Sequence, residues 1–184
     1  MAELWFIRHF RTSWNSLGRL QGHRDIPLDT SFSANNEELA MRNRLVLSEI
    51  PFTQVWVSPL ERARQTAALH GYPSAHIDPD LIEIDFGRWE GKTWDELDEA
   101  FPGAWENEIH ALPLGESFED FAARIKAVYR RAQEASGHIL IFGHGAWFGG
   151  LKMLLEGRTT GGMSKHVLKN GELVRLQSGQ SGRH

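Results

Sequence analysis

The chain contains no cysteine among its 184 residues. This absence excludes disulfide bonds and thiolate chemistry, and it favours a reducing compartment. Long apolar runs are also absent, so no segment has the length needed to span a bilayer. Glu3 and Arg8 interrupt the apolar segment near the N-terminus, which we therefore do not expect to be a signal peptide. We expect a cytoplasmic protein with no membrane partner.

The chain also has no large excess of positive or negative charge. Twenty Lys and Arg residues are set against 24 Asp and Glu residues, and the formal net charge is -4. This balance gives no reason to expect a nucleic acid as partner. Apolar residues make up 41% of the chain and charged residues 24%, which is typical of a globular protein. A chain of this length can bury a core as one domain, which we expect to cover residues 1–184.

Short apolar segments alternate with helical patterns along the chain. Strands are expected at 4–7, 55–57, 75–78, 138–142 and 173–176. Helices are expected at 37–50, 58–71, 94–100, 117–137 and 145–155, with a long loop at 16–36. Ser58 is the expected N-cap of the second helix, with Pro59 at its first position and Glu61 completing a capping box. The alternation predicts a single-domain, three-layer α/β/α sandwich around a mostly parallel sheet.

Groups that can bind an anion follow three of the expected strands. Arg8 and His9 come after the first strand, Arg62 lies in the first turn of the helix after the second, and His144 follows the fourth. In open α/β sheets, ligands bind at the carboxyl ends of the strands. Any one of these groups alone is more simply explained as a solvated surface residue. Their occurrence at three strand ends of one sheet favours a shared anion, with a phosphoryl group as the first candidate.

Arg62 and Gly145 support this interpretation. A helix N-terminus carries roughly +0.5 charge, so a cation in the first turn is disfavoured unless an anion lies there. The free N–H groups of such an end also bind phosphate. Gly145 follows His144, and a glycine lets the backbone approach a ligand closely.

Six ordered motifs resemble those of the histidine phosphatase superfamily, which has the phosphoglycerate-mutase-like fold. They are IRHFRTSWN at 7–15, GRLQGHRDIPL at 18–28, VSPLERARQTA at 57–67, LIEIDFGRWEG at 81–91, GES at 115–117 and GHG at 143–145. The fourth of them resembles the phosphatase branch. The resemblance covers nearly the whole chain.

The resemblance implies three catalytic residues and five substrate-binding residues. The catalytic residues would be His9 as the nucleophile that forms a phosphohistidine, Glu83 as the general acid, and His144 as a ligand of the phosphoryl oxygens. The substrate-binding residues would be Arg8, Asn15, Gln21, Arg62 and Gly145. These types suit phosphoryl transfer, which depends on positioning and charge stabilisation. One guanidinium group can bind two phosphate oxygens at once, through two parallel hydrogen bonds.

No metal or cofactor is expected. The other histidines show no metal-ligand spacing, and the pocket's own cations would supply the positive charge. Asp85 and Glu90 flank Glu83, but only Glu83 matches the acid position of the family. The tryptophans are expected to serve mainly in packing, although some could line a substrate pocket. The expected partner is a small phosphorylated substrate, and the expected assembly is a monomer or a homodimer.

Phe10 and Arg11 depart from the family pattern, which usually has glycine and glutamate there. Phe10 could fill the core or narrow the entrance to the site. Arg11 could be solvated, extend the anion pocket, or pair with an acid such as Asp25. Taken together, the sequence predicts a metal-independent phosphomonoesterase. The alternatives are a phosphoglycerate mutase and a non-catalytic phosphate-binding module on the same fold.

Overall fold

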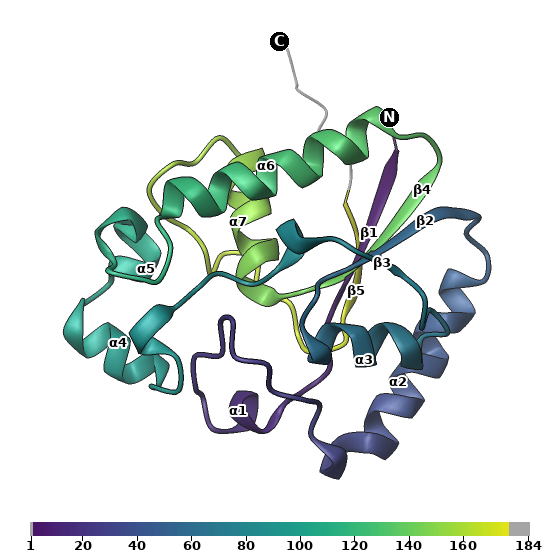
Figure 1. The fold of residues 1–184 in the computed structure, drawn as a ribbon, viewed down its shortest axis with the longest axis horizontal. Coiled ribbons are helices and arrows are strands. Elements are labelled where there is room, and N and C mark those ends of the chain that lie inside the picture. Colours follow the sequence, from purple (N-terminus) through teal and green to yellow (C-terminus); the bar gives the residue numbers. More distant parts are fainter. Residues whose placement is uncertain (1, 177–184) are drawn as a thin grey trace.

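The computed structural model describes residues 2–176 and contains a five-stranded sheet (Figure 1). The strands are β1 (Glu3–Arg8), β2 (Phe52–Val57), β3 (His76–Ile77), β4 (His138–Gly143) and β5 (Leu173–Leu176). Their order in the sheet is β3-β2-β4-β1-β5. The first four pair in parallel, and β5 runs antiparallel to β1. The predicted mostly parallel sheet is therefore confirmed.

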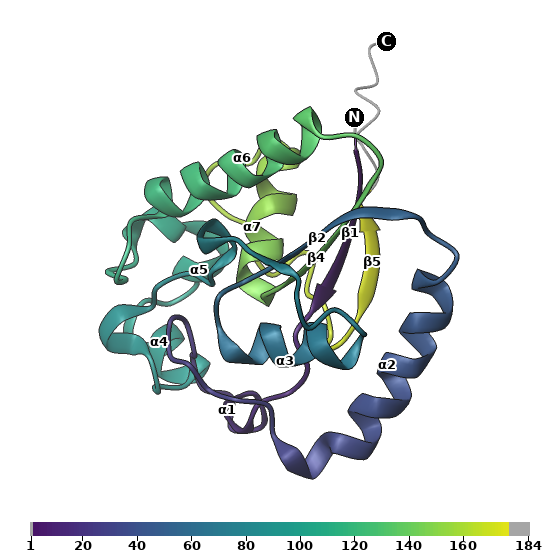
Figure 2. The same cartoon turned by 45° about the vertical axis from the view of Figure 1, so that its right-hand side comes forward.

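Helices cover both faces of this sheet. The helices α6 (Phe118–Glu134) and α7 (Gly145–Leu155) lie on one face, and α2 (Ser33–Leu47) and α3 (Glu61–Leu69) lie on the other (Figures 1 and 2). Alternate residues of β4 point to opposite sides: Ile139 and Ile141 join the core under α6 and α7, whereas Leu140 and Phe142 join the core under α3. Two cores on one sheet confirm the three-layer α/β/α architecture.

The long helix α6 forms as its apolar spacing predicts. Its buried positions follow i, i+3, i+4 spacing and are Phe118, Phe121, Ala122, Ile125, Val128 and Ala132. The Ser117 side chain accepts a hydrogen bond from the Asp120 N–H and caps the helix. Gly150 of α7 lets the two helices approach, because a Cβ there would lie 2.8 Å from Ile125 Cδ1.

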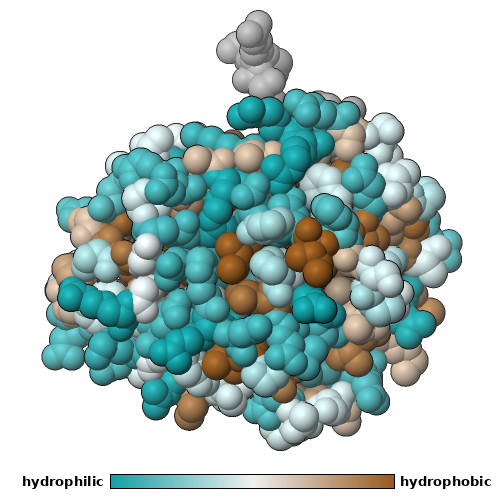
Figure 3. Space-filling view, viewed as in Figure 1, coloured by the Kyte–Doolittle hydropathy of each residue, from teal (hydrophilic) through white to brown (hydrophobic). Residues whose placement is uncertain are grey.

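Shorter elements lie beside the carboxyl ends of the strands. They are α1 (Ser13–Ser16), α4 (Trp94–Ala100), α5 (Ala104–Asn107) and the 3-10 helices η1 (Thr30–Phe32), η2 (Pro79–Leu81), η3 (Gly87–Trp89) and η4 (Ile109–Ala111). In both ribbon views α1 and α4 lie on the side of the sheet's carboxyl edge. Within residues 2–176 no helix is both long and apolar enough to cross a membrane. The face drawn in Figure 3 is mostly hydrophilic, with hydrophobic residues in small separate groups.

Two local predictions are wrong. The helix expected from residue 37 begins at Ser33, because Asp29 caps η1 and the chain continues directly from η1 into α2. Ser58 is not the N-cap of α3: the helix begins at Glu61 after an extended Leu60, and no capping box forms. The Ser58 hydroxyl is instead hydrogen-bonded to the imidazole of His144.

Candidate active site

Three neighbouring parallel strands end at one edge of the sheet and bring their next residues together. Arg8 at the end of β1 pairs with Gly143 at the end of β4. The hydrogen bonds continue past the strands: the His9 N–H donates to the Gly143 carbonyl at 2.9 Å, and the Ser58 N–H donates to the Phe142 carbonyl at 3.1 Å. His9, Ser58 and His144 are thereby fixed side by side.

His9 is buried with one ring nitrogen committed. Its side chain is 3% exposed, and Nδ1 lies 2.6 Å from the Phe10 carbonyl oxygen. A carbonyl oxygen only accepts, so Nδ1 carries the proton and Nε2 keeps its lone pair. Burial, with the charges of Arg62 and Arg8, lowers the pKa of His9 well below its usual 6.5. At neutral pH the ring is therefore uncharged, with Nε2 free to attack an electrophile.

His144 lies against His9 and is hydrogen-bonded through its other ring nitrogen, Nε2. The two ring centroids are 5.3 Å apart, and His144 Nε2 is 2.7 Å from the Ser58 hydroxyl. That hydroxyl also accepts a hydrogen bond from the Leu60 N–H, and we assign its own proton to the bond with Nε2. The proton of His144 then resides on Nδ1, which is buried and has no hydrogen-bond partner. Burial and Arg62 lower the pKa of His144 well below 6.5.

Two arginines add positive charge next to these rings. Arg62 is buried, and its terminal nitrogens donate to the carbonyls of Arg24 (2.6 Å) and Gly22 (2.8 Å). One terminal nitrogen of Arg8 donates to the Leu168 carbonyl. Burial lowers the pKa of Arg62 to about 10, so it stays charged at neutral pH. Each guanidinium is therefore anchored through its tip.

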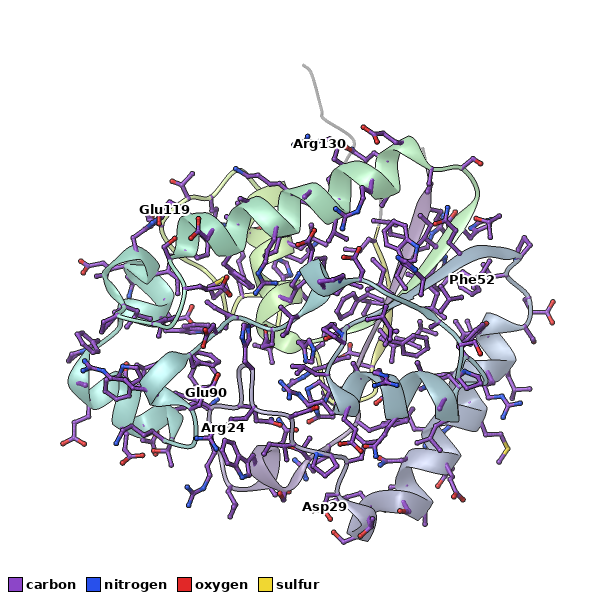
Figure 4. The ribbon with its side chains drawn as sticks, in the orientation of Figure 1. Arg24, Asp29, Phe52, Glu90, Glu119 and Arg130 are labelled. Atoms are coloured by element: carbon purple, nitrogen blue, oxygen red, sulfur yellow. The ribbon has the colours of Figure 1, made fainter. Side chains whose placement is uncertain are left out.

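The loop that carries two of those carbonyls is itself held in place. Arg24 forms an ion pair with Glu90 at 3.5 Å, and the two side chains lie next to each other in Figure 4. Glu90 also accepts a hydrogen bond from the His23 N–H, and one oxygen of Asp85 accepts one from the Gly87 N–H. Glu90 and Asp85 thus have structural partners and do not line the cavity described below.

Three donor nitrogens at this site have no partner. They are Nε of Arg8, Nε of Arg62 and Nδ1 of His144, and they are half of the six buried side-chain atoms in residues 2–176 that lack one. Buried polar groups are almost always hydrogen-bonded, and an unpaired buried cation is costly. Three free donors and two positive charges near His9 are the groups with which this part of the molecule could bind a small oxyanion.

Glu83 is the carboxylate of this site. It is 7% exposed, and its oxygens accept hydrogen bonds from the N–H groups of Ile84 (2.9 Å), Ala146 (2.9 Å) and Trp147 (2.8 Å). The last two are free N–H groups of the first turn of α7. Burial nevertheless raises the pKa of Glu83 above its usual 4.5, against the effect of these bonds and of Arg62. The carboxyl group is suited to donate and recover a proton.

A cavity of about 370 Å³ opens over these groups. Seven of the eight sequence-predicted residues line it: Arg8, His9, Asn15, Gln21, Arg62, Glu83 and Gly145. The eighth, His144, is buried beside His9, with ring centroids 5.3 Å apart, and is not among the residues that line the cavity. Thr12 donates hydrogen bonds to the amide oxygens of Asn15 and Gln21, which leaves the NH₂ groups of these two side chains available to a ligand. Gly145 leaves room for the Arg8 guanidinium, because a Cβ there would lie 3.0 Å from Arg8 Nε, closer than an ordinary contact. We find no cluster of three or more His, Asp or Glu side chains within residues 2–176 that is arranged to hold a metal ion.

Comparison with known proteins gives the family. The model of the histidine phosphatase superfamily (branch 1) matches residues 4–184. The chain belongs to this superfamily. It is thus related to enzymes that are phosphatases or mutases.

Individual relatives include both activities. The chain is 34% identical over 152 residues to adenosylcobalamin/alpha-ribazole phosphatase of Escherichia coli strain K12, covering 77% of this chain and 73% of that protein. It is 28% identical over 192 residues to the probable phosphoglycerate mutase GpmB of Klebsiella pneumoniae, covering 98% and 87%. A solved structure of a phosphoserine phosphatase mutant from Entamoeba histolytica, in complex with phosphoserine, superposes with a TM-score of 0.80 at 26% identity, covering 98% and 92%.

The two departures from the superfamily pattern lie in different environments. Phe10 is 1% exposed, stacks on His70 with ring centroids 5.3 Å apart, and packs against Gly171. Phe10 therefore fills the core, and the idea that it narrows the entrance is wrong. Arg11 is exposed, lines the cavity and lies over the Phe32 ring at 5.1 Å. Within residues 2–176 it forms no ion pair with Asp25, which instead accepts a hydrogen bond from the Glu61 N–H.

Some residues of this histidine phosphatase site were not singled out from the sequence. Ser58, expected only as a helix cap, holds His144; its position at the end of a strand beside Arg62 was the available signal. Asn170 lines the cavity and donates to the His9 carbonyl at 3.1 Å. Four residues of the segment 163–168, namely Met163, Ser164, Val167 and Leu168, line the cavity and belong to no motif. Arg19 lines it too, and its place in the motif at 18–28 was the available signal. Trp94 and Trp105 also line the cavity.

Proposed function

We propose that this protein is a metal-independent phosphomonoesterase that hydrolyses a small phosphorylated metabolite through a phosphohistidine on His9. The observation that supports it most is the set of three unpartnered donors on Arg8, Arg62 and His144 around the free Nε2 of His9. They match the oxygens of a phosphoryl group, whose charge has to be stabilised as it is transferred.

In the first step the phosphoryl oxygens accept hydrogen bonds from Arg8, Arg62 and His144. The lone pair of His9 Nε2 attacks phosphorus, and a P–N bond forms while the P–O bond to the alcohol breaks. The electron pair of that bond goes to the leaving oxygen, which takes a proton from Glu83. The alcohol then departs. A nucleophile of this kind divides one difficult displacement into two easier ones.

In the second step water attacks the phosphorus of the phosphohistidine. The Glu83 carboxylate, deprotonated by the first step, accepts a proton from the water. The P–N bond breaks, its electron pair returns to Nε2, and inorganic phosphate leaves. Glu83 is protonated again, so both groups regain their starting states. The hydrogen bond from Nδ1 to the Phe10 carbonyl keeps the same tautomer throughout.

A mutase is the second candidate, and the resemblance to GpmB favours it. A mutase would return the phosphoryl group of His9 to an organic acceptor rather than to water. The cavity lining includes exposed residues such as Arg11 and Val167, so water can reach its rim, which favours hydrolysis. Incubation with 3-phosphoglycerate, followed by product analysis, separates the two: isomerised ester indicates a mutase, and inorganic phosphate indicates a hydrolase.

The decisive experiment is turnover of p-nitrophenyl phosphate in excess EDTA. We expect hydrolysis that added Mg²⁺ does not increase and that vanadate inhibits. Activity that disappears with the chelator and returns with Mg²⁺ would contradict the proposal, and no activity at all would indicate a non-catalytic phosphate-binding module. The cytoplasmic location and the monomeric or homodimeric state stay predictions from the sequence.

A further inference from the structure

Aromatic side chains form part of the cavity wall. Phe86 precedes η3, Trp94 begins α4 and Trp105 lies in α5, and all three line the cavity. Their rings pack on one another, with centroid distances of 5.7 Å for Phe86 and Trp94, 5.6 Å for Phe86 and Trp105, and 5.0 Å for Trp94 and Trp105. Each ring is thereby held by the other two, so the wall is a preformed surface.

This wall remains open to solvent. Trp94 is 40% exposed, and it is the one aromatic residue among the large hydrophobic side chains that are exposed in residues 2–176. Val167, 68% exposed, lines the same cavity. By contrast, Trp147 is buried and its indole nitrogen donates to a backbone carbonyl, so Trp147 adds nothing to this exposed surface. Exposed apolar surface at the rim of a cavity is characteristic of a ligand contact.

The volume leaves room for more than phosphate. At about 30 Å³ per water molecule, the cavity corresponds to about twelve waters. A phosphate group has five heavy atoms, one phosphorus and four oxygens, so most of the space is left for the alcohol part of an ester. That part would lie between the phosphoryl donors and the aromatic wall.

Charge in the cavity argues against an ammonium group on the alcohol part of the substrate. Among the described residues that line it, Glu83 is the only carboxylate, and backbone N–H groups occupy its oxygens. Arg11 and Arg19 add positive charge to the lining. An ammonium group such as that of phosphoserine would meet cations without an anionic partner, whereas an uncharged ring would meet the exposed faces of Trp94 and Val167.

We propose that Trp94, Trp105 and Val167 bind a flat, apolar ring carried by the alcohol part of the substrate. This inference rests on the proposed phosphomonoesterase function and names its substrate class: phosphate esters of ring-bearing alcohols. Trp94 is the specificity-determining residue, because it lines the cavity and is more exposed than Phe86 and Trp105.

Binding of phosphonates by calorimetry tests this without requiring turnover. The probes are 2-naphthylmethylphosphonate, its decahydro analogue with the same carbon skeleton but no flat ring, and 2-amino-4-phosphonobutanoate, which mimics phosphoserine. We expect the naphthyl compound to bind at least about 5-fold more tightly than the decahydro compound, the gain that an aromatic contact provides. The amino acid should bind more weakly than both.

Variants assign the preference to the wall. Trp94→Ala should reduce the naphthyl preference to near unity, and Trp94→Phe should retain most of it. Trp5→Phe is the matched control, because Trp5 packs on Phe52 at the opposite end of the sheet and should leave the preference unchanged. Thermal unfolding of each variant establishes that it is folded. Equal affinities for the two ring compounds, tightest binding of the amino acid, or a preference that survives in Trp94→Ala would overturn the proposal.

The test separates this inference from the function on which it rests. A naphthyl preference that depends on Trp94, in a protein that hydrolyses no phosphate ester, would refute the phosphatase and leave the ring-binding wall. Hydrolysis of p-nitrophenyl phosphate by a protein without that preference would support the phosphatase and refute the ring-binding wall.

Discussion

The hydroxyl group of Thr66 accepts a hydrogen bond from the backbone N–H of Phe10 at 2.9 Å, and the carbonyl of Phe10 holds Nδ1 of His9 at 2.6 Å. Thr66 in turn donates to the Arg62 carbonyl at 2.7 Å. The helix α3 therefore does more than present Arg62. Through Thr66 it fixes the residue that sets the tautomer of His9. Thr66 is a positioning residue that lies behind the reacting groups.

Thr66→Val should slow the chemical step without weakening substrate binding. It leaves the Phe10 N–H without an acceptor, and an unsatisfied buried group costs about 1–3 kcal/mol. We expect kcat to fall by about 5- to 100-fold while KM changes little. Thr66→Ser should restore the rate, since the hydroxyl returns. Thr53→Val removes comparable hydrogen bonds at the far end of the sheet and should leave kcat intact. A Thr66→Val enzyme that loses stability but keeps its kcat would rule out a positioning role.

His9 should carry the phosphoryl group during turnover. Brief reaction with labelled substrate and acid-free quenching should give one label, stable to base and labile to acid, on the peptide that contains His9. His9→Ala should lose this label and nearly all activity, because the free Nε2 is removed. His70→Asn serves as control, since His70 is buried behind Phe10 and does not line the cavity. Substantial turnover by His9→Ala would point to another nucleophile or to direct attack by water.

Glu83→Gln should affect substrates in proportion to the basicity of their leaving group. A general acid contributes about 10²–10⁴-fold. We therefore expect a large loss of kcat for an alkyl phosphate and a small one for p-nitrophenyl phosphate, whose leaving oxygen needs little protonation. Asp85→Asn keeps the oxygen that accepts from Gly87 and should show no such dependence. Equal losses on both substrates would exclude Glu83 as the acid.

The pH dependence should follow from two opposite pKa shifts. Burial raises the pKa of Glu83 above 4.5, so the protonated acid is present below that pKa and is lost as pH rises through it. Burial, Arg62 and Arg8 lower the pKa of His9 well below 6.5, so the uncharged nucleophile is present above that pKa and is lost as pH falls through it. For an alkyl phosphate, kcat/KM should therefore be bell-shaped. The alkaline limb should disappear in Glu83→Gln, and its persistence there would assign that limb to another group.

The sequence predicts those parts of the molecule that depend on local patterns. Continuous apolar runs identified β1 and β4, because both faces of these strands are buried. The i, i+3, i+4 spacing identified α6, because one face of this helix buries apolar side chains. Ser58 shows the limit. Its neighbours fit a helix cap, but the chain stays extended through Leu60, and the hydroxyl bonds to a histidine 86 positions later. No local pattern encodes that partner.

The aromatic wall shows the same limit on a larger scale. Phe86, Trp94 and Trp105 lie on three short elements without a common period, and only the packing of η3, α4 and α5 brings their rings together. Arg8, His9, Arg62, His144 and Gly145 were easier to find, because each lies within a few residues of the end of a strand. Asn15, Gln21 and Glu83 were found only through the family motifs. The roles of all eight stay predictions.

The position of β1 has a consequence for the order of events during synthesis. This strand is made first, yet both of its neighbours in the sheet, β4 and β5, come from the last third of the described chain. Arg8 donates to the Leu168 carbonyl, and the carbonyls of Arg8 and His9 accept from the Gly171 N–H. A nascent chain emerging from the ribosome therefore holds the proposed nucleophile, His9, without these partners until about residue 171 is available. The backbone that supports His9 is complete only after β4 and the turn before β5 have been made.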